Sequence, residues 1–144
     1  LYLGPGKSAL KAGAEILVGF YMPLQQQGQA SAFLRVMRPQ GVALPVLNMA
    51  CWLHQQDNRI LDLRLSVGPG GTIPHRARAV EQVLRGQLFT PVAMDQGGQA
   101  LLQDAHFRTS PRRASSQYRQ HLALELLAEV IQAAWERAGA VVVR

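Results

Sequence analysis

The chain contains 144 residues, of which 48% are hydrophobic, and it carries a net charge of +6 at pH 7. These values are typical of a single globular domain with a hydrophobic core. No apolar run approaches the roughly 18 residues that a membrane-spanning helix requires, and no secretory signal is recognisable, so we expect a cytoplasmic protein that contacts no membrane. The single cysteine, Cys51, lies in an apolar run and is expected to be a buried thiol rather than a nucleophile.

Strands are predicted throughout the first half of the chain. Residues 13–23 are rich in β-branched and aromatic side chains and are bounded by glycine and proline, which indicates a strand. Residues 32–38 alternate in part and end before a proline, which indicates a second strand. Residues 45–55 are almost wholly apolar, so we expect a central strand with both faces covered.

Residues 59–68 alternate clearly between apolar and polar side chains. One face of the expected strand carries Leu61, Leu63, Leu65 and Val67, and the other face carries Asp62, Arg64 and Ser66. This alternation is the pattern of a strand with one face in water. A short polar turn separates it from the strand over 45–55, so the two strands are expected to form an antiparallel hairpin.

Helices are predicted in the second half of the chain, where the hydrophobic period becomes helical. Residues 75–86 have apolar residues at helical spacing and end at a glycine. Residues 90–106 begin with a threonine N-cap followed by proline, and residues 115–139 form the strongest predicted helix. Strands followed by helices predict an α+β fold, with a small antiparallel sheet of three or four strands packed with a three-helix bundle, in a single domain over residues 1–144.

One charged residue, Arg119, falls on the apolar face of the last predicted helix. Winding at about 100° per residue places Leu126 and Val130 on the same face. A buried guanidinium must be paired or hydrogen-bonded to carbonyl groups. We therefore expect Arg119 to be a structural anchor that ties the start of this helix to the preceding loop, with a role in ligand binding as the alternative.

The segment SVGPGGTIPHR, residues 66–76, raises the question of whether its glycines bind phosphate. A phosphate loop usually has a lysine followed by Ser or Thr, which is absent, and Ile73 occupies the third glycine position of a dinucleotide-binding motif. Two prolines also remove two amide donors. We predict a turn that joins strand to helix, in which Gly70 and Gly71 are required for backbone conformation. An anion bound at the start of the following helix is the alternative.

No catalytic or metal-binding constellation is recognisable in the sequence. The four histidines are far apart and lack cysteines or carboxylates at metal-ligand spacing. The basic segment FRTSPRRASSQYR, residues 107–119, has two aromatic residues but lacks the repeated aromatic–basic pattern of a nucleic-acid-binding surface. We interpret it as a solvated basic loop and expect no nucleic-acid partner.

Four segments resemble one known family and follow its order. They are LGPGKSALKAGAEILVGFYMP (3–23), FLRVMRPQGVALPVLNMACWL (33–53), SVGPGGTIPHRARAVEQVLRG (66–86) and SSQYRQHLALELL (115–127). They resemble the C-terminal domain of the FAD-binding (medium) subunit of molybdenum hydroxylases, the family of carbon monoxide dehydrogenase and xanthine dehydrogenase. Tyr118 and Arg119 match the Tyr-Arg pair that opens the family's final helix, and we expect structural roles for both.

The resemblance implies an accessory domain of a larger flavoprotein. In the family, this domain follows two FAD-binding domains and closes over part of the flavin. Residues 1–23 resemble the connection from a flavin-binding domain that is missing here, and residues 24–144 resemble the C-terminal domain itself. The implied partners are the flavin-binding domain of the same subunit and the molybdopterin and iron–sulfur subunits, with which the parent subunit exchanges electrons. FAD would belong to the parent subunit, and no cofactor is expected in the isolated chain.

One cofactor contact is carried over from the resemblance. Arg35 stands where the family often has a lysine near the flavin, and Val42 stands where it often has an aspartate. The alternative for Arg35 is a solvent-facing strand residue. The first hypothesis for the chain is a C-terminal accessory domain of a molybdenum-hydroxylase-type oxidoreductase that is not catalytic alone. The alternative is a stand-alone protein-interaction module of the same fold that binds no cofactor.

Overall fold

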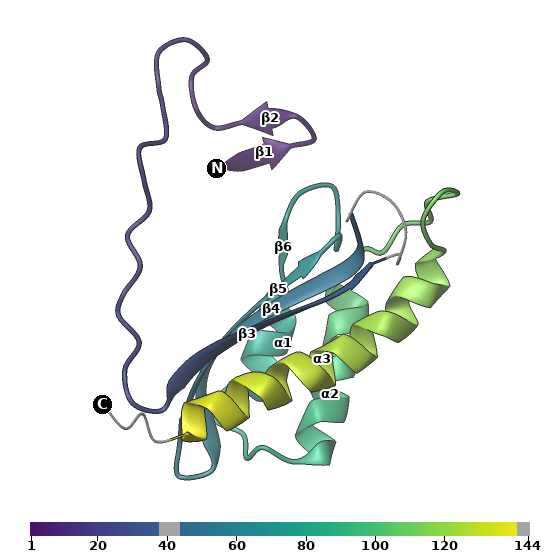
Figure 1. The fold of residues 1–144 in the computed structure, drawn as a ribbon. Coiled ribbons are helices and arrows are strands. Elements are labelled where there is room, and N and C mark those ends of the chain that lie inside the picture. The colour runs from purple at the N-terminus through teal and green to yellow at the C-terminus, as the bar shows by residue number, and fades with distance from the viewer. Residues whose placement is uncertain (38–43, 141–144) are drawn as a thin grey trace.

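A computed structural model describes residues 1–37 and 44–140 of the chain. Its body is a four-stranded antiparallel sheet with three helices on one face, and an N-terminal segment extends away from this body (Figure 1). The strands are β3 (Gln29–Met37), β4 (Pro45–Gln56), β5 (Arg59–Gly68) and β6 (His75–Arg76), in the spatial order β3-β4-β5-β6. The predicted end of the second strand, Arg38, lies outside the described residues.

The predicted hairpin between the two longest strands is confirmed. β4 and β5 pair antiparallel along their length. Their turn contains Asp57 and Asn58, both with positive φ, at 50° and 59°. Two successive residues of this conformation form the turn whose twist matches that of a hairpin, and Asp and Asn tolerate it well.

One part of the predicted alternation in β5 is wrong. The register of the hairpin shifts between His54 and Gln55, so that Leu61 has no Cα partner on β4. Leu61 is therefore 38% exposed, whereas Ile60 is fully buried. An extra residue in one strand reverses the side-chain alternation beyond it, which the sequence pattern alone does not reveal.

The predicted strand over residues 13–23 is also wrong. The segment contains no strand, and its large apolar side chains are exposed, including Val18 at 93% and Phe20 at 75%. Only a short hairpin of β1 (Tyr2–Gly4) and β2 (Lys7–Ser8) precedes it. A strand requires a neighbour for its backbone hydrogen bonds, and within the described residues nothing pairs with this segment.

The three helices begin and end close to their predicted bounds. They are α1 (Arg78–Leu84), α2 (Pro91–Asp104) and α3 (Ser116–Gly139). The Oγ1 of Thr90 accepts a hydrogen bond from the amide of Ala93, and the Oγ of Ser115 accepts one from the amide of Tyr118. These side chains satisfy helix-terminal donors as the sequence predicts. α1 begins later than predicted because the two residues of β6 first pair with the end of β5.

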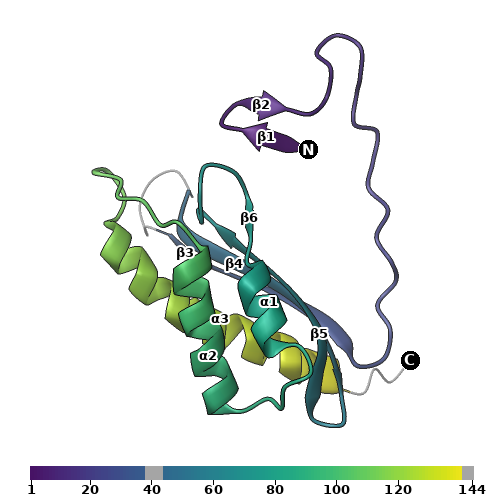
Figure 2. The same ribbon diagram turned by 180° about the vertical axis from the view of Figure 1, so that it is seen from behind.

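The helices form a layer on one face of the sheet (Figure 2). α3 packs along β3 and β4, α1 packs on β5, and α2 contacts both α1 and α3. The core between sheet and helices includes fully buried side chains from both layers, among them Leu47, Met49, Leu63, Leu84, Val130 and Ile131. The predicted α+β class, with a small antiparallel sheet and three helices, is confirmed. The predicted packing as a three-helix bundle is not confirmed in detail, since α2 packs against both α1 and α3 but the backbones of α1 and α3 do not approach each other closely.

The expectation that both faces of the central strand are covered is wrong. Buried and half-buried residues alternate along β4, so that Leu47, Met49, Cys51 and Leu53 face the helices. The intervening side chains lie on the outer face, which no helix covers (Figure 1). Trp52 and Ala50 made the run look uniformly apolar, although only half of it belongs to the core.

We expect Gly70→Ala to destabilise the fold and Gly71→Ala to leave it nearly unchanged. An added Cβ at Gly70 would lie 2.6 Å from Cγ1 of buried Val67 and 3.0 Å from Cβ of His75. At Gly71 it would meet only the carbonyl oxygen of Ile73, at 3.9 Å. Overpacking of this kind costs about 1–3 kcal/mol, and urea denaturation measures it. A similar loss at both positions would contradict the argument from close approach.

Candidate functional site

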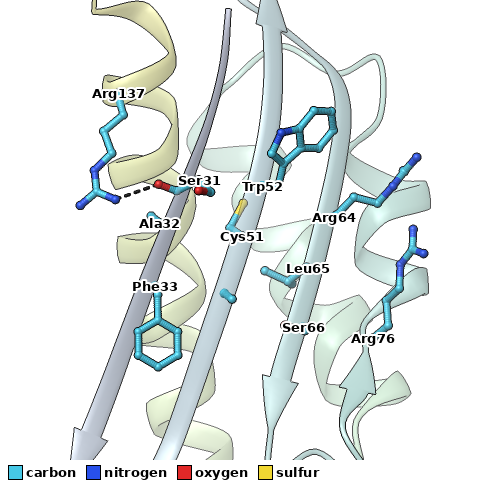
Figure 3. Close-up of a pocket in the computed structure, with 11 residues that line it drawn as sticks. Ser31, Ala32, Phe33, Cys51, Trp52, Arg64, Leu65, Ser66, Arg76 and Arg137 are labelled. Carbon is cyan, nitrogen blue, oxygen red and sulfur yellow. Dashed lines mark hydrogen bonds between the residues drawn. The ribbon is translucent and has the colours of Figure 1, made fainter. Parts of the chain in front are cut away.

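The outer face of the sheet is the candidate functional site. Its centre is apolar, with Phe33 on β3 opposite Ala50 on β4, and Trp52 two residues further along β4, opposite Ser31. Phe33 is 56% exposed and stands at one side of a shallow hollow of about 510 Å³ (Figure 3). An exposed aromatic group beside apolar neighbours is typical of a surface that another molecule covers.

Arginines from three elements surround this apolar centre. Arg64 of β5 and Arg76 of β6 stand on the side opposite Phe33, and Arg137 of α3 reaches the edge strand (Figure 3). Nη1 of Arg137 donates a hydrogen bond of 2.8 Å to the carbonyl oxygen of Ser31. Nη1 of Arg64 lies 2.6 Å from Oδ1 of Asp62. The candidate surface therefore has an apolar centre and a mainly cationic rim, which suits an apolar ring or surface that carries negative groups.

Arg35 lies on the same face of the sheet, two residues beyond Phe33 along β3. It is exposed on β3 and is paired in register with Asn48 of β4, which is paired in turn with Gly68 of β5. The structure thus places Arg35 in line with the start of the loop at Pro69, and its role in binding a cofactor stays a prediction. Val42 lies outside the described residues.

A buried carboxylate, Glu81, joins α1 to the strands beside the hollow. Its side chain accepts two hydrogen bonds from Arg76, each 2.8 Å long, and one of 2.9 Å from the amide of Leu65. Burial favours the neutral acid, but the bonds from Arg76 and the Leu65 amide outweigh burial, so the pKa of Glu81 is lowered. The carboxylate therefore stays ionised and fixes Arg76 at the rim of the candidate surface.

The thiol of Cys51 faces the core and not the candidate surface. Cys51 is 2% exposed, and burial, assisted by the nearby charge of Glu81, raises its pKa to about 12. A thiol with such a pKa is protonated at neutral pH and is a weak nucleophile. The interpretation of Cys51 as a buried hydrophobic residue is confirmed.

The remaining residues singled out by the sequence do not line the hollow beside Phe33. Gly70 and Gly71 lie in the loop between β5 and β6, and neither is among the positive-φ glycines of the described chain. Tyr118 is 49% exposed in the first turn of α3. Arg119 is 2% exposed, and its Nη1 donates a hydrogen bond of 3.1 Å to the carbonyl oxygen of Arg108. The structural roles expected for Gly70, Tyr118 and Arg119 stay predictions, whereas neither a positive φ nor a close contact requires glycine at position 71.

Sequence reasoning missed Glu81, although the signal was present. Glu81 lies four residues after Ala77 and three before Leu84, on the apolar face of its helix. The same winding that placed Arg119 on an apolar face would have placed Glu81 there. The outer-face pair of Phe33 and Trp52 was missed for another reason, because an apolar strand residue does not reveal which face is covered.

The described part of the chain, residues 1–37 and 44–140, also bears on metal binding and on membrane insertion. No group of three His, Cys, Asp or Glu side chains there is arranged to hold a metal ion. No helix among these residues is both long enough and apolar enough to cross a membrane.

Comparisons with known proteins place the chain in a family. Residues 32–134 match the model of the CO dehydrogenase flavoprotein C-terminal domain. Because the match extends over most of the chain, the chain belongs to this family, in agreement with the resemblance noted in the sequence. A search of curated proteins found no significant match.

Solved structures of larger proteins share the fold. Carbon monoxide dehydrogenase from Hydrogenophaga pseudoflava, in a form that lacks the Mo-pyranopterin moiety of its molybdenum cofactor, is 19% identical with a TM-score of 0.73, and the match covers 80% of this chain and 39% of that one. Quinoline 2-oxidoreductase from Pseudomonas putida 86 is 20% identical with a TM-score of 0.69, and the match covers 78% of this chain and 39% of that one. Reconstituted CO dehydrogenase from Oligotropha carboxidovorans is 19% identical with a TM-score of 0.72, covering 81% and 40%. The chain thus spans about two fifths of the length of these proteins.

We expect Glu81→Gln to lower stability at pH 7 by about 1.5–3 kcal/mol, the range for a hydrogen bond to a charged group. The lowered pKa means that the Glu81 carboxylate stabilises the fold above about pH 4.3, its ordinary pKa. This stabilisation is lost as the pH falls through the lower pKa of the folded state. Urea denaturation at pH 7 and pH 3 measures the effect, and the difference between the two proteins should shrink at pH 3. Exposed Glu129→Gln is the control, and an equal loss there would contradict the role of Glu81.

We expect Arg119→Ala to cost about 2–4 kcal/mol, because it opens a void and leaves the Arg108 carbonyl without its donor. Arg119→Lys should recover part of the loss, since an ammonium group cannot reproduce a planar guanidinium. Exposed Arg112→Ala should cost less than about 0.5 kcal/mol. Urea denaturation compares the three, and equal small losses would show that Arg119 is not an anchor.

Proposed function

We propose that the chain is the C-terminal accessory domain of the flavoprotein subunit of a molybdenum-hydroxylase-type oxidoreductase. Its role is to help enclose FAD, which the parent subunit binds mainly through other domains, and to pack against partner subunits during electron transfer. The observation that carries this proposal is the outer face of the sheet, where exposed Phe33 and half-buried Trp52 stand between cationic side chains. Family membership supports the same role, since the matched family is defined by a flavoprotein domain.

The exposed apolar side chains of the N-terminal segment support the proposal that a neighbouring domain covers it. Between residues 16 and 24 the exposed apolar side chains are Ile16, Leu17, Val18, Phe20, Tyr21, Met22 and Leu24. Such a run is costly in water and becomes favourable when another domain covers it. The same residues resemble the family's passage from the flavin-binding domain. We therefore assign residues 1–23 to the junction with that domain and residues 24–144 to the accessory domain itself.

The residues of the outer face fit the edge or face of a flavin ring but not its phosphates. Phe33 and Trp52 offer apolar and aromatic surface, and Arg35 offers a cation on the same face. The loop after β5 has prolines at positions 69 and 74, which cannot donate backbone hydrogen bonds to a pyrophosphate. When bound, FAD supplies the electron-carrying chemistry. This chain's residues would cover the ring, exclude water from it and place the charge of Arg35 beside it.

The activity of the whole enzyme would belong to the assembly. The solved structures similar to this chain include proteins described as Cu,Mo-CO dehydrogenase and quinoline 2-oxidoreductase. By analogy with them, we propose molybdopterin and iron–sulfur subunits as partners, with a cytoplasmic location and no membrane or nucleic-acid contact. The alternative is a stand-alone interaction module that kept the fold and binds no cofactor.

We expect the natural gene product, isolated from its own cells by an affinity tag, to carry FAD, molybdenum and iron. Phe33→Asp should abolish the recovery of all three, because a carboxylate at the centre of the outer face opposes docking without entering the core. Val92→Asp, which changes an exposed residue of α2 (66% exposed), should leave recovery unchanged. FAD released by acid is measured by fluorescence, and the metals are measured by mass spectrometry.

Each outcome separates the two hypotheses. Absence of flavin and metals from every preparation, with partner proteins still recovered, would favour the stand-alone module. For residues 1–144 expressed alone, we expect a folded, colourless protein after desalting from excess FAD. Retention of one FAD per chain would contradict the accessory role, because it would show that this domain holds the whole cofactor.

A further inference from the structure

Arginines line a second hollow, where the loop between α2 and α3 meets the first turn of α3. Its volume is about 410 Å³, and its lining includes Arg108, Arg112, Arg113, Arg119 and Ser110. None of the described residues that line it is acidic. The hollow lies beyond the end of β5, at Pro69, and shares no lining residue with the apolar hollow of the outer face.

Arg119 is unusual because it is buried without a carboxylate. It is 2% exposed, one of its nitrogens bonds to the carbonyl oxygen of Arg108, and its Nε is buried without a described hydrogen-bond partner. Burial, together with the nearby charges of Arg108 and Arg113, lowers the pKa of Arg119. The isolated chain therefore holds a cation where its surroundings disfavour positive charge, and a bound anion would remove this cost.

Two backbone amides at this end of α3 already have side-chain hydrogen-bond partners. The amide of Ser116 donates to Oγ1 of Thr109 at 3.0 Å, and the amide of Tyr118 donates to Oγ of Ser115 at 3.1 Å. We expect the guanidinium groups of the lining arginines to hold a ligand in the hollow. The helix dipole adds further positive potential at this position.

We propose that this arginine hollow binds a phosphate group, either as free phosphate or as part of a phosphate ester. The planar fork of a guanidinium matches two phosphate oxygens at once. A phosphate dianion offsets more of the converging positive charge than a single carboxylate does. The proposal is independent of the accessory role, because the arginine hollow shares no lining residue with the apolar hollow of the outer face.

Isothermal titration of the full chain with inorganic phosphate tests the proposal, with ionic strength kept constant by NaCl. Titration with methyl phosphate distinguishes an ester ligand from the free ion. We expect saturable binding, weakened at least tenfold in Arg112→Gln and in Arg119→Met. Met fills most of the volume of Arg119 without its charge, so we expect this variant to stay folded. Arg59→Gln is the control at the opposite end of β5 and should bind as the unmodified chain does.

The proposal is overturned if no binding is seen beyond that of chloride, or if both variants bind phosphate as tightly as the unmodified chain. Equal weakening in Arg59→Gln would also overturn it, because net charge alone would then explain binding. If Arg119→Met does not fold, Arg112→Gln decides, since Arg112 is exposed and lies outside the core. Tighter binding of a hexaglutamate peptide than of either phosphate would replace the proposed ligand by an acidic protein segment.

Discussion

A small sheet with helices on only one face is the constraint on which the rest of this structure depends. The inner face and the helices share one dry core, in which Leu47, Met49 and Ile131 are fully buried. The outer face has no such layer, yet it presents Phe33 at 56% exposure. The arginines at its rim are held in place by protein partners: Arg76 by Glu81, Arg64 by Asp62 and Arg137 by the carbonyl oxygen of Ser31. The hydrophobic core is fully enclosed, whereas the outer face of the sheet leaves apolar side chains exposed. This combination is expected of a domain that packs against other domains of a larger subunit.

Glu81 links these two sides of the sheet. Its carboxylate is buried in the helical layer, yet it binds Arg76, whose guanidinium lines the hollow of the outer face. The bond from the Leu65 amide fixes the same carboxylate to β5. A buried acid without these donors would favour its neutral form, and its lowered pKa shows that the donors prevail. The position of one rim cation is therefore set by core packing rather than by solvent.

Local signals predicted most of the fold, and longer-range pairing decided the rest. Thr90 and Ser115 mark their helix starts correctly because a capping side chain acts within three residues. Leu61 was misplaced because a register shift depends on the partner strand. Residues 13–23 have the composition of a strand, but a strand forms only beside a neighbour, and the described chain supplies none. The outer face was overlooked for the same reason, since burial of an apolar residue on a strand is a property of what covers it.

Glu81 and Arg119 are both charged residues on the apolar face of a helix, and the sequence alone does not distinguish their roles. Glu81 and Arg119 have the same signature in the sequence, a single ion within an apolar stripe. In the structure Glu81 accepts bonds from a guanidinium and an amide, whereas the described partner of Arg119 is one carbonyl. Replacing a buried ion by an apolar side chain of similar size is often neutral or stabilising, so stability alone does not require arginine at a site with so little compensation. The apolar stripe in the sequence indicates where both charged residues lie. Only the hydrogen bonds in the structure distinguish Glu81, whose charge is compensated within the fold, from Arg119, for which we propose a ligand.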